Sequence, residues 1–254
     1  MSSLGELIDD AALFPPGSAP MPVAVAAHRR HRTAAYAELI GPFLCPVGRV
    51  AELQGELRPG DRLRVGLIAG ADQAGLAGLP EAVAAVAADD RLHLDRVELP
   101  LGPHLSELPD LPPGVTVWVE VPWAGASLGG LRERGAGAKF RTGGAVVPPV
   151  EALAERIVSC HAGVPLPFKC TAGLHSAVRH GGAHGFLNVL VASGTAARGG
   201  TAAEVAAVLA ETSGDRLVAE LRRAGTRGAF RSFGSCSVGE PLADLVALGL
   251  WTGT

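Results

Sequence analysis

The sequence predicts an α/β protein folded as a single (β/α)8 barrel of the TIM type. Short apolar runs alternate with helical segments along most of the chain, which is typical of parallel strands that are buried on both faces and joined by helices. The length of 254 residues suits one such barrel. Hydrophobic residues make up 48% of the chain and charged residues 19%, so a large core is feasible.

Eight apolar runs are the candidates for the barrel strands. Leu92–Leu99 alternates as a strand should, and Val115–Val121 is rich in β-branched and aromatic residues. Leu63–Ala69 is an almost continuous apolar run, and Ala11–Phe14 is stopped by Pro15-Pro16-Gly17. The full set is Ala11–Phe14, Phe43–Val47, Leu63–Ala69, Leu92–Leu99, Val115–Val121, Ala138–Thr142, Phe168–Thr171 and Phe230–Phe233.

Segments with a helical residue pattern lie between these runs. Gly41-Pro42 should end the helix that begins at Pro22, and the helix over Leu187–Ser193 should begin near His175–Ala183. The helix candidates are Leu4–Ile8, Pro22–Ile40, Gln73–Ala88, Ser127–Arg134, Val150–His161, Leu187–Ser193, Thr201–Thr212, Asp215–Ala224 and Leu242–Leu248.

Residues 1–254 are expected to form one domain, because the chain shows no repeat of fixed period and no linker between domains. Residues 198–227 are too long for one ordinary crossover, so they predict an inserted helical segment before the last strand. The alternative fold is a doubly wound open parallel sheet. No GxGxxG motif follows the first strand candidate, so a dinucleotide-binding version of that fold has no support.

Composition and charge argue against several classes of protein. The formal net charge of −3 disfavours a nucleic-acid binder, and no apolar run reaches about 18 residues, so no membrane span is expected. The opening MSSLGELIDD lacks the features of a signal peptide, and the abundance of Ala and Gly suggests a bacterial coding bias. We expect a cytoplasmic enzyme with reduced thiols, because no CxxC spacing occurs among Cys45, Cys160, Cys170 and Cys236.

Two lysines occupy similar settings, Lys139 in GAKFRTGG and Lys169 in PFKCTAGLH. Strand alternation puts Lys139 and Arg141 on one face of their strand, and Lys169 and Thr171 on one face of the next. If these faces line the barrel, burial and mutual repulsion should lower the lysine pKa toward neutrality. A neutral lysine attacks carbonyl groups and forms a Schiff base.

The simpler alternative is that each lysine pairs with a buried carboxylate. Three acidic residues, Asp95, Glu98 and Glu120, also lie in strand candidates. Glu120 ends the clearest strand, where catalytic side chains of barrels are found. Both interpretations of the lysines stay open at this point.

The segments around both lysines resemble those of deoxyribose-phosphate aldolases. KFRTGG from Lys139 resembles the sixth-strand K-x-S-T-G-F segment of that family, and KCTAGLH from Lys169 resembles its seventh-strand K-A-S-G-G-I-R segment. Gly234-Ser235-Cys236 resembles the G-T-S of its phosphate-binding eighth strand end, and the region of Asp95 to Glu98 loosely resembles its fourth strand.

This resemblance implies that Lys139 forms the Schiff base and that Lys169 lowers its pKa. Asp95 or Glu98 would then help to move protons. The chain also resembles a group of uncharacterised bacterial proteins in IDDAALFPPG, AKFRTGG, FKCTAGLH and HGFLNVL, and that likeness implies no activity.

Several further residues are candidates for binding substrate. Arg141 could hold a substrate carboxylate in a bidentate pair, which suits a keto acid better than a sugar phosphate. Glycine N–H groups at strand ends could hold an anion, although ordinary turns also use glycine. The substrate-binding candidates are Asp10, Arg141, Thr142, Gly143, Gly144, Thr171, Gly173, Gly234 and Ser235.

Histidines after the seventh strand candidate offer another chemistry. His175 is an acid–base candidate. With Glu120 or an aspartate, the cluster of His175, His180 and His184 could hold a divalent metal ion.

Three functions follow, in order of preference. The first is a cofactor-independent lyase or aldolase that acts on a small carbonyl, keto-acid or phosphorylated substrate through a lysine Schiff base. The second is a metal-dependent hydrolase, isomerase or lyase that uses Glu120 and His175, and the third is a non-catalytic anion-binding barrel. The expected partner is a small, anionic molecule rather than a nucleic acid or membrane, and the chain could form a homo-oligomer.

Overall fold

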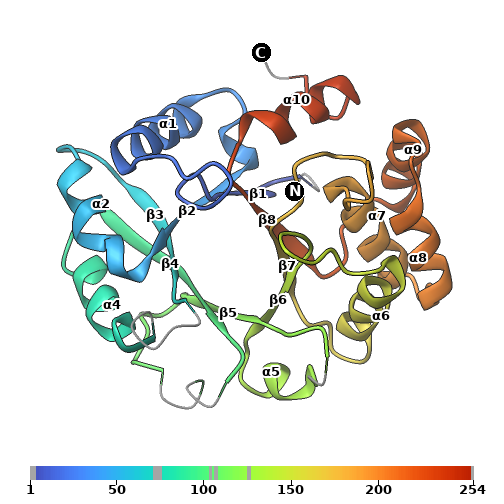
Figure 1. Cartoon of the computed structure of the whole chain (residues 1–254), viewed down its shortest axis with the longest axis horizontal. Helices are drawn as coiled ribbons and strands as arrows, with labels where there is room; N and C mark the ends of the chain where they lie inside the picture. The colour runs from blue at the N-terminus through green and yellow to red at the C-terminus, as the bar shows by residue number, and fades with distance from the viewer. Residues whose placement is uncertain (1–3, 71–75, 103–104, 106–107, 125–126, 253–254) are drawn as a thin grey trace.

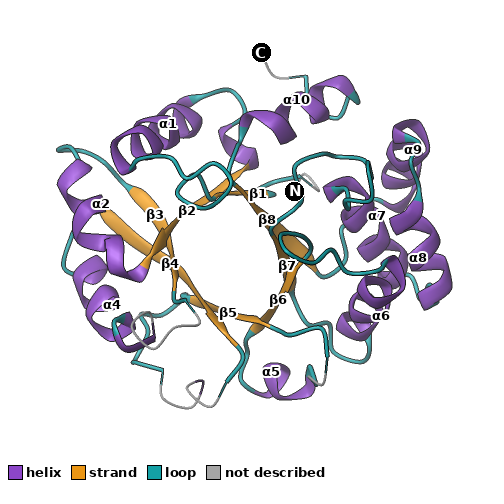
Figure 2. Ribbon diagram, viewed as in Figure 1, coloured by secondary structure: helices purple, strands orange, loops and turns teal. Residues whose placement is uncertain are grey.

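The chain folds into a closed barrel of eight parallel strands in a computed structural model that describes residues 4–70, 76–102, 105, 108–124 and 127–252. The strands follow one another around the barrel in sequence order, and helices surround them (Figures 1 and 2). The strands are β1 (Ile8–Asp10), β2 (Ile40–Pro46), β3 (Leu63–Ile68), β4 (Leu92–Pro100), β5 (Thr116–Glu120), β6 (Gly137–Arg141), β7 (Phe168–Thr171) and β8 (Phe230–Ser235). The predicted TIM-type barrel is therefore confirmed.

Closure depends on β1, which pairs in parallel with β2 on one side and with β8 on the other. Asp9 lies opposite Gly234, and Asp10 lies opposite Ser235. In an open sheet each of the two outermost strands is paired on one side only. Because β1 is paired on both sides, the doubly wound alternative is wrong for this chain.

Helices form the outer layer of the barrel (Figure 2). They are α1 (Met21–Thr33), α2 (Val50–Glu56), α4 (Leu79–Ala87), α5 (Gly129–Glu133), α6 (Val150–His161), α7 (Phe186–Ala197), α8 (Ala202–Ala210), α9 (Gly214–Ala224) and α10 (Gly239–Ala247), with short 3-10 turns at Ala37–Leu39 and Val47–Arg49. Both α8 and α9 lie between α7 and the last strand. The predicted start of one helix at Gln73 falls outside the described residues.

The N-terminal segment differs from the prediction. Leu4–Ile8 is not a helix, because a turn leads directly into β1, and Ala11–Phe14 is a turn after that strand rather than a strand itself. Two adjacent aspartates disfavour a strand on propensity alone. Here the ion pair of Asp9 with Arg96 and the hydrogen bond of Asp10 with His28 compensate for their burial.

Two predicted helices also have different limits. The helix predicted over Pro22–Ile40 ends at Thr33, and β2 begins at Ile40, so Gly41 and Pro42 lie inside a strand. Gly41 is needed there because a Cβ would collide with the Asp9 carboxylate. The helix α7 begins at Phe186, not within 175–183, where the chain forms turns and an isolated bridge.

The apolar core lies between the barrel and the helices rather than inside the barrel. Phe140, Phe168 and Phe230 pack in a row on the outer strand faces, with ring centroids 5.7 and 5.4 Å apart. Because strand side chains alternate, the neighbouring positions point to the barrel axis, where charged residues gather. No helix in the described part of the chain is long and apolar enough to cross a membrane.

All four cysteines are free thiols in the structure. Cys45, Cys160 and Cys170 are buried, whereas Cys236 is partly exposed. Burial raises the pKa of the Cys45 and Cys160 thiols to about 12, so these side chains behave as inert core residues.

Candidate active site

The two lysines identified from the sequence lie side by side inside the barrel. Lys139 on β6 is in register with Lys169 on β7, as strand alternation predicted. The chain has 22 lysine and arginine residues, and these two are its only lysines. Both side chains are buried.

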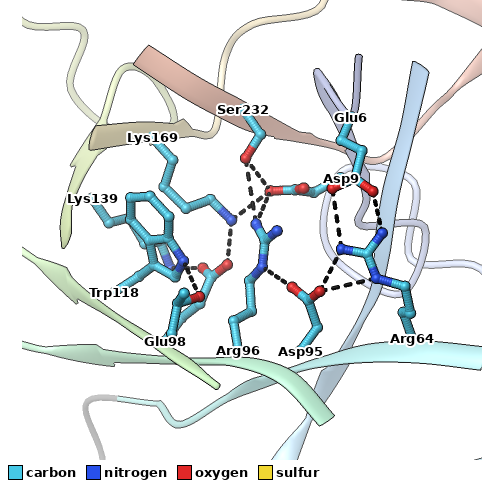
Figure 3. Close-up of polar contacts among 11 residues, drawn as sticks. Glu6, Asp9, Arg64, Asp95, Arg96, Glu98, Trp118, Lys139, Lys169 and Ser232 are labelled. Atoms are coloured by element: carbon cyan, nitrogen blue, oxygen red, sulfur yellow. Dashed lines mark hydrogen bonds and ion pairs between the residues drawn. The ribbon is translucent and has the colours of Figure 1, made fainter. Parts of the chain in front are cut away.

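Each lysine is paired with carboxylates that come from other strands (Figure 3). Lys139 Nζ lies 3.0 Å from Glu98 Oε2 and 3.1 Å from Glu120 Oε2. Lys169 Nζ lies 2.6 Å from Asp9 Oδ2 and also donates to Glu98 Oε1. Glu98 therefore joins the two lysines.

Exposure increases along this cluster toward the C-terminal ends of the strands, which we call the mouth of the barrel. The side chain of Lys169 is 0% exposed and that of Lys139 7%. Glu120, the last residue of β5, is 27% exposed, and Arg141, the last residue of β6, is 52% exposed. Lys139 is thus the lysine nearer to solvent.

The pKa of Lys139 contradicts the expectation that repulsion would lower it. Burial does oppose the charged form, but the carboxylates of Glu98 and Glu120 outweigh burial and raise this pKa above its usual value. The sequence correctly placed two cations on neighbouring strands and offered Glu98 and Glu120 as candidate partners, but it did not decide whether these carboxylates reach the lysines. The alternative that Lys139 pairs with buried carboxylates is the one observed.

The two glutamates remain ionised for the matching reason. Burial opposes the charge of Glu98, but Lys169, Lys139 and Arg96 together lower its pKa to about 2. Burial also opposes the charge of Glu120, whose pKa is lowered by Lys139 and Arg141.

A second group of ion pairs lies deeper, toward the N-terminal ends of the strands, which we call the base of the barrel (Figure 3). Arg96 Nη1 lies 3.0 Å from Asp9 Oδ2, and Arg96 Nε donates to Asp95 Oδ2 at 2.8 Å. Ser232 Oγ donates to Asp9 Oδ2 at 2.8 Å. Gly66 leaves room for Arg96, because a Cβ there would press on the arginine stem.

Asp95, predicted as a catalytic acid, belongs to the base and not to the mouth. Its carboxylate pairs with Arg96 and Arg64, and Arg64 also pairs with Glu6. Burial opposes the charge of Asp95, but Arg96 and Arg64 lower its pKa. In the described part of the chain, Asp95 forms no ion pair with either lysine, which leaves Glu98 as the carboxylate of β4 that joins them.

Asp9 is the main residue that sequence analysis missed. It contacts Lys169 inside the barrel, whereas its predicted neighbour Asp10 lies on the opposite face, where its carboxylate meets His28 Nδ1 at 2.9 Å. Alternation along Ile8-Asp9-Asp10 would have separated the two aspartates if this segment had been read as a strand. The same rule applied to Arg96-Val97-Glu98 would have placed Arg96 beside Glu98.

The loop after β6 packs against the loop after β7. Thr142 Oγ1 donates to Ala172 O at 2.7 Å, and a Cβ on Gly143 or Gly173 would collide with the backbone of the other. Gly173 also has a φ of +79°, which favours glycine. These predicted anion-binding residues therefore have a clear packing role, and anion binding by them stays a prediction.

The remaining substrate-binding candidates lie at the ends of β6, β7 and β8. Thr171 lies in register with Arg141, and Gly144 has a φ of +94° in the loop beyond it. Gly234 lies on β8 opposite Asp9, and Ser235 Oγ donates to Ser237 O at 2.6 Å.

The three histidines do not form one site. His175 Nδ1 lies 3.3 Å from Glu240 Oε2, His180 bridges to Ala183, and buried His184 contacts Pro148 O through Nε2. Within the described ranges, no group of three or more His, Cys, Asp or Glu side chains could hold a metal ion. The geometry therefore does not support the metal site expected from Glu120 and His175.

Comparisons of the chain with models of known protein families, with curated proteins and with solved structures gave no match.

Proposed function

We propose that this protein is a cofactor-independent lyase of the aldolase type, in which Lys139 forms a Schiff base with a small carbonyl substrate. The main support is the use of lysine itself. Every other side-chain cation in the chain except histidine is arginine, including the buried Arg96, and the only two lysines lie in register inside the barrel. Arginine can hold an ion pair as well as lysine, but it cannot give up its proton and attack a carbonyl.

Lys139 is the better candidate for the nucleophile. Its side chain is 7% exposed and connects through Glu120 to the partly exposed Arg141, whereas Lys169 is 0% exposed and held by Asp9 and Glu98. A substrate entering from the mouth reaches Lys139 first. Lys169 would act through Glu98, which it shares with Lys139.

The raised pKa of Lys139 means that the amine must lose a proton before it reacts. Glu120 Oε2, 3.1 Å from Nζ, is placed to accept that proton. The amine then adds to the carbonyl carbon, and loss of water gives a protonated imine. Overall, an ammonium ion and a carbonyl become an iminium ion and water, so the positive charge stays between Glu98 and Glu120.

This conservation of charge reconciles the salt bridges with Schiff-base chemistry. The carboxylates that stabilise the ammonium also stabilise the iminium, because both are cations at the same position. The iminium then withdraws electrons from the adjacent carbon bond, which is the step that a lyase needs. Glu98 or Glu120 is positioned to move the following proton.

The non-catalytic anion-binding barrel has less support. Lys139, Lys169 and Arg141 are matched by Glu98, Glu120 and Asp9, so this cluster has no surplus positive charge. A non-catalytic site would have to hold its anion by such a surplus, whereas a covalent bond to lysine does not depend on one.

The direct experiment is borohydride trapping. The protein is incubated with acetaldehyde, dihydroxyacetone or pyruvate and then reduced, which adds hydride to the imine carbon and fixes the adduct as a secondary amine. We expect the mass increase to map to Lys139. Absence of modification with every carbonyl, or modification of only the N-terminal amine, would contradict the proposal.

A further inference from the structure

We propose that the substrate is a 2-keto acid whose carboxylate binds the unused edge of the Arg141 guanidinium while its keto group meets Lys139. This assignment rests on the proposed Schiff-base function and adds the substrate class. It also gives Arg141 a second task, which is to help Glu120 take the proton of Lys139.

Only one edge of the Arg141 guanidinium, formed by Nε and Nη2, is hydrogen-bonded to another described side chain of the protein. Its Nε donates to Glu120 Oε1 at 2.9 Å and its Nη2 to Glu120 Oε2 at 3.4 Å. Nη1 has no hydrogen-bond partner among the residues that the structure describes, and the side chain is 52% exposed. A planar guanidinium can bind a carboxylate on each of two edges, so the edge formed by Nη1 and Nη2 is available for a second carboxylate.

The spacing of the two cations fits a compact substrate. A single carboxylate, that of Glu120, contacts Arg141 Nε at 2.9 Å and Lys139 Nζ at 3.1 Å. The guanidinium and the amine are therefore separated by about the width of one carboxylate. In a 2-keto acid the carboxylate carbon is bonded directly to the keto carbon, whereas a sugar phosphate separates its anion from its carbonyl by several bonds.

The region in which such barrels commonly hold phosphate, after the seventh and eighth strands, is acidic here. An open hollow of about 530 Å³ lies between the loops that follow β1 and β7 and the helix α10, which follows β8. Its described lining is Pro16, His175, Ser176, Glu240, Ala243 and Asp244, which includes two carboxylates and no lysine or arginine. A phosphate dianion would be repelled there.

Binding of a substrate carboxylate would also prepare the nucleophile. Arg141 now lowers the pKa of Glu120, together with Lys139. When a second carboxylate shares the guanidinium, Glu120 loses part of that stabilisation and becomes a stronger base toward the proton of Lys139. The C–N bond then forms as the carbonyl π bond breaks, and the departing oxygen leaves as water with two of the three ammonium protons.

The test compares pyruvate with pyruvamide, which keeps the keto group and removes the negative charge. Trapping of Lys139 by borohydride is measured against concentration for the native chain, Arg141→Gln and the matched surface control Arg134→Gln. We expect pyruvate to give half-maximal trapping at a concentration about tenfold lower than pyruvamide in the native chain. Arg141→Gln should remove most of this advantage of pyruvate over pyruvamide, and Arg134→Gln should keep it.

The same assay compares glyceraldehyde 3-phosphate with glyceraldehyde. No gain from the phosphate is expected. Equal trapping by pyruvate and pyruvamide, an advantage that survives Arg141→Gln, or a clear gain from the phosphate would overturn the keto-acid assignment and leave the Schiff base standing. Absence of any lysine adduct would overturn both.

Discussion

The base and the mouth of the barrel interior are built from different cations. At the base, Arg96 and Arg64 pair with Asp9, Asp95 and Glu6. At the mouth, lysines take the corresponding positions and share Glu98, while Asp9 contacts both groups.

The arginines at the base stabilise the barrel, whereas a lysine at the mouth can also react with a substrate. A guanidinium stays charged under all ordinary conditions and binds carboxylates in a fixed fork, so the base can hold β1, β3, β4 and β8 together. An ammonium can lose a proton to a neighbouring carboxylate and then form a covalent bond. If this division holds, substitutions at the mouth should affect Schiff-base formation more than substitutions at the base.

Exchange of lysine for arginine at the mouth should have the largest effect. Lys139→Arg keeps the charge that Glu98 and Glu120 need, but it removes the nucleophile and should abolish borohydride trapping. Lys169→Arg changes the cation that shares Glu98 with Lys139, so proton transfer through Glu98 should suffer and trapping should slow by about 10²-fold. Adduct mass over time measures both, and unchanged trapping in Lys139→Arg would exclude Lys139 as the nucleophile.

Loss of Glu98 should cause the largest change in stability. Glu98→Gln leaves two buried lysines with fewer anionic partners, and we expect the free energy of unfolding to fall by about 3–5 kcal/mol. Glu120→Gln is the matched control at a half-buried position, where about 1 kcal/mol is expected. Urea denaturation measures both variants, and equal losses would show that the depth of the carboxylate does not matter.

Acid should destabilise the fold through the same carboxylate. The pKa of Glu98 is about 2 in the folded protein against 4.5 when unperturbed, so its contribution is complete above pH 4.5 and is lost as the pH falls toward 2. The loss from this group is about 3 kcal/mol. For Lys139 the sign is opposite, because its raised pKa gives a contribution that is lost only above pH 10.5.

Denaturation of the native chain across this pH range, with Glu98→Gln as control, provides the measurement. The variant should lose much of the acid dependence below pH 4.5. An identical acid profile in the two proteins would assign the effect to other carboxylates.

Substitution of an arginine at the base should lower stability without abolishing Schiff-base formation at Lys139. Arg96→Met removes two charged hydrogen-bonded contacts, so unfolding should become easier by about 2 kcal/mol. Trapping of Lys139 should change less than about threefold, because its contacts with Glu98 and Glu120 remain. If Arg96→Met lost as much trapping as Lys139→Arg, the base would be as important for Schiff-base formation as the mouth, which would contradict the division of roles.

The smallest effect is expected at the outer edge of the base. Arg64 and Glu6 are partly exposed, so Arg64→Gln should cost less than about 1 kcal/mol, and the difference should shrink in high salt. Urea denaturation at low and high salt measures this difference in the free energy of unfolding. A larger loss that does not depend on salt would show that Arg64 contributes as much to stability as a buried residue.

The sequence predicted the barrel because most strands can be recognised from their own residues. Leu63–Ala69 and Val115–Val121 are apolar and β-branched, and they overlap β3 and β5 closely. The first strand was missed because Ile8-Asp9-Asp10 looks unlike a strand until Arg96 pairs with Asp9 and His28 hydrogen-bonds with Asp10. Such partners are distant in sequence and meet only when the barrel closes.

Contacts between residues that are distant in sequence also explain which properties of the two lysines could be predicted. Alternation placed Lys139 and Lys169 on the inner face correctly, because that rule is local to each strand. The raised pKa of Lys139 depends on Glu98 and Glu120 from two other strands, so it could not follow from the segments around the lysines. The scarcity of lysine is visible in the sequence itself and is the strongest local signal for these two residues.

Because the chain has only two lysines, NMR of the protein labelled with ¹³Cε-lysine can show which of them forms the imine. Two signals are expected, and Lys139→Arg assigns them. Addition of acetaldehyde or pyruvate should shift the Lys139 signal to that of an imine, while the Lys169 signal should not move. Two unmoved signals, or an imine at Lys169 alone, would contradict the account.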